Sequence, residues 1–363
     1  EGEGVFCGSQ RNQSYGFSST NLTREFTAWG KVGFGIWAND YMDGSYGILG
    51  IRKTTLTVDG KTVFESVVDS IPSHCNRMVN TWGDYEHYCH SRVWYMKSFA
   101  DPGNTLPFIN VGTADRGIVT FDEERDYHLA YTVSDIFGNS RQYTFTVKGK
   151  RQDIPVARRR SVMNMLLHDR INGFQRPGLM LLVPKGLLPD NVELSPKVKA
   201  KPDALSDEWR FYDRSYPLLG WAKISLRLKK KVADPSKLYI VSHYGVDRNM
   251  GGEFKDGWVT GRMRELGADY EIAYDDIPPV LTSFNASARR LRVLAYDRQS
   301  GLRSLKGYVD GRFVLFEYME KAGVYVCDLP SAPVAKTGGN HTVKLVAVDE
   351  RGNRSVFVGD FKY

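Results

Sequence analysis

The chain has 363 residues, of which 42% are hydrophobic, 12% aromatic and 25% charged, and its formal net charge is +7. This composition excludes an intrinsically disordered chain, because frequent aromatic and β-branched residues supply enough apolar surface for a buried core. The longest apolar run, residues 178–183, is far shorter than the ~20 residues that a membrane-spanning helix needs. At ~150 residues per domain the length predicts two or three domains, and we expect no membrane span.

The positive charge is unevenly distributed along the chain. Residues 1–150 carry 14 Lys and Arg against 17 Asp and Glu, a net charge of −3, whereas residues 151–279 (22 against 17) and 280–363 (13 against 8) each carry +5. A basic surface can attract anionic bacterial glycans or phosphate-bearing lipids, although solvated surface charge is the simpler interpretation. The basic run at 229–231 lies outside any nucleic-acid-binding motif, so we expect no nucleic-acid partner.

Short segments with period-two alternation recur from one end of the chain to the other. They lie at residues 32–36, 129–133, 143–147, 222–228 and 343–347. Such alternation places one face of a strand on a core and the other face in water. Asp-Gly and Gly-Gly turn signals separate these segments, and residues 157–171 are the best helix candidate. The pattern predicts an all-β protein built from tandem β-sandwiches rather than from a helix-flanked parallel sheet.

Two seams interrupt the strand pattern. Residues 148–155 are charged and end at Pro155, and residues 275–279 end in two prolines that cannot continue a central strand. The seams predict three β-domains, at 1–150, 151–278 and 279–363. The first and third are expected to be Ig-like sandwiches, and the middle domain a distinct β-sandwich with a basic surface.

The outer domains repeat one pair of turn motifs. Val-Asp-Gly occurs at Asp59-Gly60 and at Asp310-Gly311, and Asp-x-x-Gly-Asn occurs at Asp135, Gly138 and Asn139 and again at Asp349, Gly352 and Asn353. Glycine adopts positive φ at low cost in such turns, and the Asp side chain accepts hydrogen bonds from nearby backbone N–H groups. The two domains are therefore predicted to be the same sandwich with hairpin turns at matching places.

The spacing of the two motifs differs between the copies. The interval from Asp59 to Asp135 is 76 residues, whereas the interval from Asp310 to Asp349 is 39 residues. The first copy therefore contains an insertion of 76 − 39 = 37 residues. We expect this insertion to include much of residues 73–108.

The insertion holds the densest group of chemically distinctive side chains. Cys75 and Cys89 can pair in an oxidising compartment, whereas Cys7 and Cys327 stand alone. The weak metal-ligand candidates are His74, His87 and His90, whose spacing matches no known zinc motif. The ligand-stacking candidates are Trp82, Tyr85, Tyr88, Trp94 and Tyr95. The favoured alternative is that these aromatic residues close one end of their own sandwich.

No catalytic motif occurs in the sequence. It contains no His-x-His, no His-Glu-x-x-His, no Gly-x-Ser-x-Gly and no phosphate-binding glycine loop. We therefore assign no catalytic residue, and we expect no cofactor in this chain.

Several stretches together resemble a known family. They include WGKVGFGIWANDYMDGSYG at 29–47, VWYMKSFADPGNTLPF at 93–108, LMLLVPKGLLPDNVELSP at 179–196 and GNHTVKLVAVDERGNRS at 339–355. They are similar to the region after the catalytic domain in secreted zinc endopeptidases of the lysostaphin and beta-lytic (LytM-like) family, in a Gram-negative lineage. The resemblance covers nearly the whole chain.

The resemblance implies a peptidoglycan-directed or peptide-directed hydrolase with zinc on a His and an Asp of one motif and a His of a His-x-His motif. This sequence has neither motif, so zinc is expected only in a catalytic domain upstream of Glu1. The chain begins without an initiator Met or a signal peptide, which favours a processed or truncated start. We predict an exported, non-catalytic scaffolding or wall-binding region, located in the periplasm or cell envelope, with peptidoglycan or another envelope glycan or peptide as its partner.

Three alternatives stay open. The first is a stand-alone glycan-binding or adhesion module that uses the insertion. The second is a hydrolase with an unrecognised site, and the third is a eukaryotic cell-surface protein.

Overall fold

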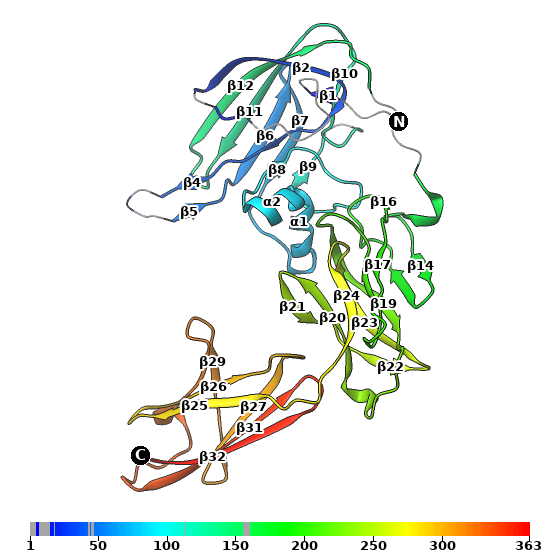
Figure 1. The fold of residues 1–363 in the computed structure, drawn as a ribbon. Helices are drawn as coiled ribbons and strands as arrows, with labels where there is room; N and C mark the ends of the chain where they lie inside the picture. The colour runs from blue at the N-terminus through cyan, green and yellow to red at the C-terminus, as the bar shows by residue number, and fades with distance from the viewer. Residues whose placement is uncertain are drawn as a thin grey trace.

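The computed structural model describes residues 5–6, 15–17, 19–42, 44, 47–112, 114–154 and 160–363. Strands account for 49% of the structure and helices for 8%, so the predicted all-β class is confirmed. Three hydrophobic cores follow one another along the chain and define an N-terminal unit (β1–β12), a middle unit (η2–β24) and a C-terminal unit (β25–β32) (Figure 1). Among the helices in this described part, none is long and apolar enough to cross a membrane.

The N-terminal unit is built on one large sheet with the order β1-β2-β12-β11-β6-β7-β9, and β10 pairs with the far end of β2. Strand β2 runs parallel to β12, and the other ladders of this sheet are antiparallel. The elements are β1 (Val5–Phe6), β2 (Asn21–Val32), β3 (Gly35–Ile36), β4 (Asp40–Tyr41), β5 (Ile48–Leu49), β6 (Lys53–Val58), β7 (Lys61–Val67), η1 (Ser73–Met78), α1 (Val79–Trp82), α2 (Tyr85–Ser91), β8 (Met96–Lys97), β9 (Ile109–Asn110), β10 (Val119–Phe121), β11 (Asp126–Ser134) and β12 (Ser140–Gly149).

The middle unit consists of two five-stranded sheets, β14-β15-β19-β23-β22 and β17-β18-β24-β20-β21. Its elements are η2 (Val162–Asn164), β13 (Met165–Leu166), β14 (Asn172–Arg176), β15 (Leu179–Val183), β16 (Val192–Glu193), β17 (Lys197–Lys199), β18 (Glu208–Arg210), β19 (Pro217–Arg227), η3 (Pro235–Lys237), β20 (Leu238–Tyr244), β21 (Val246–Asn249), β22 (Glu253–Lys255), β23 (Trp258–Glu265) and β24 (Asp269–Tyr274). In β15 the burial alternates residue by residue, as the period-two pattern predicts for a strand with one face on the core.

The C-terminal unit packs two four-stranded sheets, β25-β26-β30-β29 and β28-β27-β31-β32. Its elements are β25 (Val280–Ala286), β26 (Arg290–Tyr296), β27 (Leu302–Val309), β28 (Arg312–Val314), β29 (Glu317–Met319), β30 (Val324–Asp328), η4 (Leu329–Ser331), β31 (Asn340–Asp349) and β32 (Arg354–Lys362). Read as strands A to G, the first sheet has the order A-B-E-D and the second has C, F and G plus an added edge strand, which is the order of an immunoglobulin domain.

The helix predicted at residues 157–171 is wrong over the part that the structure describes, residues 160–171. There the chain forms the 3-10 turn η2 and the short strand β13. Val162 and Met163 are largely exposed, whereas Leu166 is buried and pairs with Val192 across β16. A helix in this segment would have withdrawn Leu166 from the core of the middle unit.

The repeated Val-Asp-Gly motif forms the same hairpin in both outer units. Asp59 and Gly60 join β6 to β7 with φ of 49° and 77°, and Asp310 and Gly311 join β27 to β28 with φ of 48° and 79°. The carboxylate of Asp59 accepts a hydrogen bond from His128 N at 2.9 Å on the neighbouring strand β11. The carboxylate of Asp310 accepts the equivalent bond from Thr342 N at 3.0 Å on β31.

The Asp-x-x-Gly-Asn motif also forms matching turns. Asp135 Oδ1 accepts from the backbone N–H of Asn139 at 2.9 Å, and Asp349 Oδ1 accepts from that of Asn353 at 2.9 Å. Each Asn side chain in turn donates to the second oxygen of its own aspartate, at 2.6 and 2.8 Å respectively. The first turn is exposed, but Asp349 and Asn353 are buried, because the second turn lies against the middle unit.

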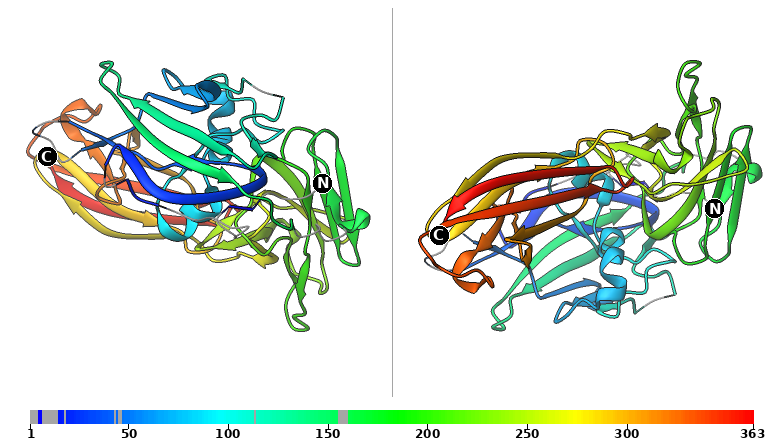
Figure 2. Two further views of the ribbon diagram at one scale, coloured as in Figure 1. Left: turned by 90° about the horizontal axis from the view of Figure 1, so that it is seen from above. Right: turned by 90° about the horizontal axis from the view of Figure 1, so that it is seen from below.

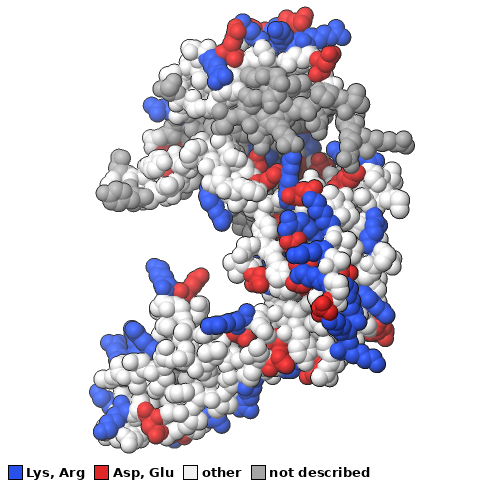
Figure 3. Space-filling model, viewed as in Figure 1, with Lys and Arg blue, Asp and Glu red and all other residues white. Residues whose placement is uncertain are grey.

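Figures 1 and 2 show that the N-terminal and C-terminal units extend to the same side of the middle unit. Figure 3 shows an open hollow between the two outer units, with Lys and Arg side chains mixed with Asp and Glu over the middle unit. Many of these charges are paired. Lys197 contacts Asp213 at 2.5 Å, and Arg210 Nε contacts Asp269 at 2.8 Å. The mixed pairing favours solvated surface charge over a purely basic face in this region.

Candidate functional site

The aromatic insertion forms a joint between units instead of an open stacking surface. Trp82 ends helix α1, is only 7% exposed and packs edge-on against Phe108, with ring centroids 5.2 Å apart. Trp94 lies over Gly83, where an added Cβ would stand 2.2 Å from the Trp94 ring. The assignment of Trp82 as a ligand-stacking residue is therefore wrong, because its ring is enclosed by its own core.

The other aromatic candidates contact one another or the middle unit. Tyr88 packs on Trp94 with centroids 5.3 Å apart, and Tyr95 packs on His87 at 5.1 Å. The phenol of Tyr85 donates to Glu265 Oε2 at 3.1 Å across the boundary with the middle unit. The hydroxyl of Tyr85 is therefore bonded to a residue of the same chain. Burial and the charge of Glu265 raise the pKa of this phenol.

Several further contacts fix this N-terminal junction. Arg77, in η1, donates from Nε to Leu218 O at 2.6 Å and from Nη2 to Arg264 O at 3.1 Å. Glu86, on α2, pairs with Arg214 at 3.3 Å. The backbone N–H of Gly103 donates to Pro189 O at 2.7 Å, and an added Cβ at Gly103 would stand 2.2 Å from Leu188 O, so the backbones meet too closely for any larger residue.

The buried carboxylate of Glu265 is the centre of the junction. Its Oε1 accepts from Tyr216 N at 2.5 Å and from Gly267 N at 3.1 Å, while Oε2 accepts from Tyr85. Burial raises the pKa of Glu265, although these hydrogen bonds and the charge of Arg77 oppose the shift. Removing any one donor leaves a buried acceptor less satisfied, which is costly in a low-dielectric environment.

The possible disulfide between Cys75 and Cys89 is not formed, because both cysteines are free in this structure. Cys75 is buried in the core of the N-terminal unit, and its thiol lies 3.5 Å from Pro72 O. Cys89 lies on α2 toward the middle unit, where it interacts with Tyr244. Cys75 lies on η1 and Cys89 on α2, and the two thiols contact different partners. Cys327 is also free and buried, and Cys7 lies outside the described residues.

The three histidines proposed as weak metal ligands do not converge. His90 Nδ1 lies 2.8 Å from the carbonyl oxygen of Glu86 one helical turn earlier, and His87 packs on Tyr95. His74 is exposed on η1. Within the described ranges, two other groups of side chains bring ligand atoms together, namely Glu208, His243 and Glu271, and Asp275, Asp297 and Asp349.

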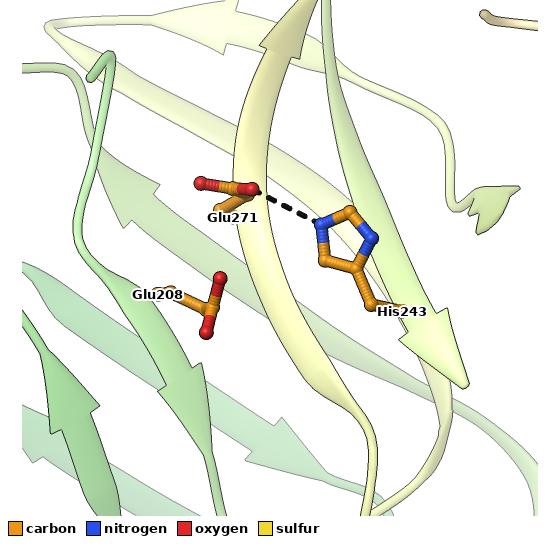
Figure 4. A group of neighbouring side chains, drawn as sticks. All are labelled: Glu208, His243 and Glu271. Carbon is orange, nitrogen blue, oxygen red and sulfur yellow. Dashed lines mark hydrogen bonds and ion pairs between the residues drawn. The ribbon is translucent and has the colours of Figure 1, made fainter. Parts of the chain in front are cut away.

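The first group lies on three adjacent strands of the middle unit, β18, β24 and β20 (Figure 4). His243 Nε2 lies 3.0 Å from Glu271 Oε1, and His243 Nδ1 lies 2.6 Å from Asp247. Partial burial opposes protonation of the ring, but the bonds to Asp247 and Glu271 outweigh it, so the pKa of His243 is raised. This favours the charged imidazolium, which cannot bind a metal through either nitrogen.

A lysine also occupies this group. Lys201 Nζ lies 2.5 Å from Glu208 Oε2 and 2.8 Å from Glu271 Oε2, so it already bridges the two carboxylates. A zinc ion needs neutral imidazole and free carboxylate oxygens. The residues present therefore do not fit a zinc site, and the arrangement is a network of ion pairs across three strands.

The second group lies where the middle unit meets the C-terminal unit. Asp275 and Asp349 are fully buried, and one carboxylate oxygen from each lies within 4.8 Å of one from Asp297. Such an all-oxygen donor set suits Ca²⁺ or Mg²⁺ by its chemistry and does not suit zinc. Asn353 Nδ2 donates to Asp275 O at 2.9 Å and to Asp349 Oδ2 at 2.8 Å, so the amide links the linker to the turn of the C-terminal unit.

Other contacts complete this C-terminal junction. Ser300 N donates to Asp275 Oδ2 at 3.1 Å, and Asn249 Nδ2 donates to Ser300 O at 2.8 Å. Arg351, inside the Asp-x-x-Gly-Asn turn, donates from Nη1 to Leu238 O at 3.0 Å and to Gly252 O at 3.1 Å. Burial and the nearby charges of Asp275 and Asp297 raise the pKa of Tyr239 to about 12. The second copy of the Asp-x-x-Gly-Asn turn thus connects the C-terminal unit to the middle unit.

A family model and several solved structures are similar to this chain. A family model described as Zu5-like domain matches residues 163–275, which lie in the middle unit. The search of curated proteins found no match.

Three solved structures are similar at low identity. The first is the Bacteroides ovatus mixed-linkage glucan utilization locus SGBP-B in complex with a mixed-linkage heptasaccharide, with a TM-score of 0.16 and 10% identity over 91% of this chain and 63% of that chain. The second is a Ca²⁺-stabilized adhesin that helps an Antarctic bacterium bind ice, with a TM-score of 0.15 and 9% identity over 92% of this chain and 94% of that chain. The third is the N-terminal eight Ig domains of Down Syndrome Cell Adhesion Molecule, with a TM-score of 0.18 and 10% identity over 94% of this chain and 59% of that chain. This chain spans less than two thirds of the length of the first and the third. These TM-scores are far below those of proteins that share a whole-chain arrangement, so the three structures indicate nothing about the function of this chain.

Proposed function

We propose that this chain is the non-catalytic scaffold of an exported, peptidoglycan-directed zinc-peptidase-like protein, and that it holds three β-units in a fixed arrangement. One observation carries the proposal. The chemically distinctive residues of the sequence, Tyr85 in the insertion and Asn353 in the repeated turn, make buried polar contacts between units. Residues used as joints are not free to perform chemistry on a substrate.

The energetics support a fixed arrangement at both junctions. A hydrogen bond to a charged group contributes about 1.5–3 kcal/mol. Tyr85 makes such a bond to Glu265 across the N-terminal junction, and Ser300 N makes one to Asp275 across the C-terminal junction. Interfaces between domains of one chain are otherwise mobile by default. The fixed hollow between the outer units would then present a partner domain or an envelope polymer in one orientation.

Incubation of the purified chain with isolated peptidoglycan tests the scaffold role. We expect no release of muropeptides, with or without added zinc, as measured by reversed-phase chromatography of the soluble fraction. Release of muropeptides that a chelator abolishes would show a hydrolase and would contradict the proposal. A lysostaphin-type peptidase added to the same peptidoglycan provides the positive control.

A second candidate function, glycan binding or adhesion, is favoured by a different observation. The segment around the β4–β5 hairpin exposes Trp37 (54%), Tyr41 (65%), Met42 (54%) and Ile48 (65%) to solvent. Exposed aromatic residues of this kind can stack on sugar rings. If the chain binds polysaccharide in a sedimentation assay, Trp37→Ala should abolish binding while Trp82→Ala should act only by lowering stability.

A further inference from the structure

A polar pocket of about 390 Å³ opens at the N-terminal junction, between η1 and α1 of the N-terminal unit and β19 and β23 of the middle unit. Its lining residues are His74, Asn76, Arg77, Asn80, Leu219, Gly220 and Arg264. The volume lies at the lower end of the range for small-ligand sites. Every charged side chain in this lining is basic.

The arginines of the pocket lack an acid at ion-pair distance among the described residues, although the charges of Glu265 and Arg77 act on each other. Across the described residues, no ion pair involves Arg77, Arg262 or Arg264. The nearest acid along the chain, Glu265, directs its two oxygens to Tyr85 and to the backbone of residues 216 and 267. Burial, followed by the charges of Arg77 and Arg262, lowers the pKa of Arg264, which is the direction expected for clustered cations.

The two arginines are already held in place. Arg77 is anchored by its bonds to Leu218 O and Arg264 O, which leave its remaining N–H groups available. The guanidinium of Arg264 lies 3.6 Å from the ring centroid of Trp221, and that of Arg262 lies 4.6 Å from the same ring. Side chains fixed before binding lose little entropy when a ligand arrives.

Arg264 also carries an unsatisfied donor. Among the residues that the structure describes, its Nε is one of few buried side-chain nitrogens without a hydrogen-bond partner. A buried N–H without an acceptor is destabilising, and more so when it belongs to a charged group.

We propose that this junction pocket binds an oxyanion, the carboxylate or phosphate group of an acidic ligand, between Arg77 and Arg264. The forked N–H groups of arginine match two oxygens of such a group, and charge-assisted bonds of this type are about twice as strong as neutral ones. Asn76 and Asn80 supply amide donors at the rim, and His74 supplies a ring N–H. The inference goes beyond the scaffold role and stands or falls independently of it.

Isothermal titration calorimetry at constant ionic strength tests the proposal, with sodium phosphate as one probe and trigalacturonate, a carboxylated sugar, as the other. We expect saturable binding of at least one probe, and the probe that binds identifies the source of the oxyanion. Arg264→Gln should weaken that binding about 10-fold or more, because it removes a charge-assisted donor. Arg227→Gln is the matched control, since Arg227 also stacks on a tryptophan of the same sheet, Trp258, but lies outside the pocket.

A second variant tests the pocket in case Arg264→Gln fails to fold. His74 and Asn76 have exposed side chains, so the double variant His74→Ala/Asn76→Ala should fold normally and still weaken binding several-fold. Absence of saturable binding for both probes would overturn the proposal. So would binding that survives both the Arg264→Gln and the double substitution, or binding that Arg227→Gln weakens equally.

Discussion

The Tyr85→Phe substitution isolates one hydrogen bond at the N-terminal junction. It removes only the hydroxyl that donates to Glu265 Oε2 at 3.1 Å and leaves the aromatic ring in place. Glu265 is 7% exposed, so water cannot easily replace the lost donor. Because Oε1 keeps its bonds to the backbone of residues 216 and 267, we expect a loss of about 2 kcal/mol in the free energy of unfolding.

Differential scanning calorimetry measures this effect unit by unit. A loss of about 2 kcal/mol corresponds to a decrease of about 4–8 °C in Tm for a cooperative unit of 150–250 residues. The transition of the C-terminal unit, which does not contact Tyr85, should stay unchanged. Tyr88→Phe is the matched control, since Tyr88 lies on the same helix and its ring packs on Trp94. Equal decreases in Tm for the two variants would show that the hydrogen bond from Tyr85 to Glu265 does not stabilise the junction.

Three other predictions concern the networks and exposed residues of the structure. The pKa of His243 is raised above its ordinary value of 6.5, so the stabilisation by its ion pairs should be fully present below about pH 6.5 and be lost as the pH rises through the higher pKa of the folded state. A Tm difference between wild type and His243→Gln that does not shrink with rising pH would argue against this. Asn353→Ala should lower the free energy of unfolding by about 2–3 kcal/mol in chemical denaturation, because it removes the buried hydrogen bonds to Asp275 and Asp349. Asn139→Ala, in the exposed copy of the turn, should lower the free energy of unfolding by less than half as much. Trp37→Ala should leave Tm within about 1 °C of wild type, because the side chain is 54% exposed, and a larger decrease would show that the ring is part of the core.

The turns were predictable because their chemistry is local. Asp59-Gly60 and Asp310-Gly311 take positive φ within the motif itself, and the aspartates accept hydrogen bonds from the adjacent strand of the same sheet. The Asp-x-x-Gly-Asn turns close on their own residues as well. Period-two alternation likewise predicted the strands, because each strand needs one face on a core.

The joints were not predictable from the sequence, because they depend on contacts between distant segments. Tyr85 and Glu265 are separated by 180 residues, and nothing in the pattern around either one indicates the other. The aromatic composition of the insertion is visible in the sequence, but composition does not distinguish a ring buried between two units from a ring exposed for a ligand. By the same limit, closeness in sequence made a Cys75–Cys89 disulfide possible but could not show that the two thiols are free.

The network around His243 was missed for a related reason. Glu208, His243 and Glu271 lie on strands that are neighbours in the sheet order β18-β24-β20 but not in the sequence. Glu208 begins β18, Glu271 lies within β24 and His243 lies near the end of β20, so only the pairing register places the three on one face. Strand order is set by the packing of the whole unit, which a single sequence does not reveal.

Small-angle X-ray scattering of the whole chain tests most directly whether the three units are held in one arrangement. If the units are fixed, a single curve calculated from the structure, with both outer units on one side of the middle unit (Figure 1), should fit the measured profile. A profile that requires a mixture of extended arrangements would contradict the fixed junctions on which the scaffold role depends.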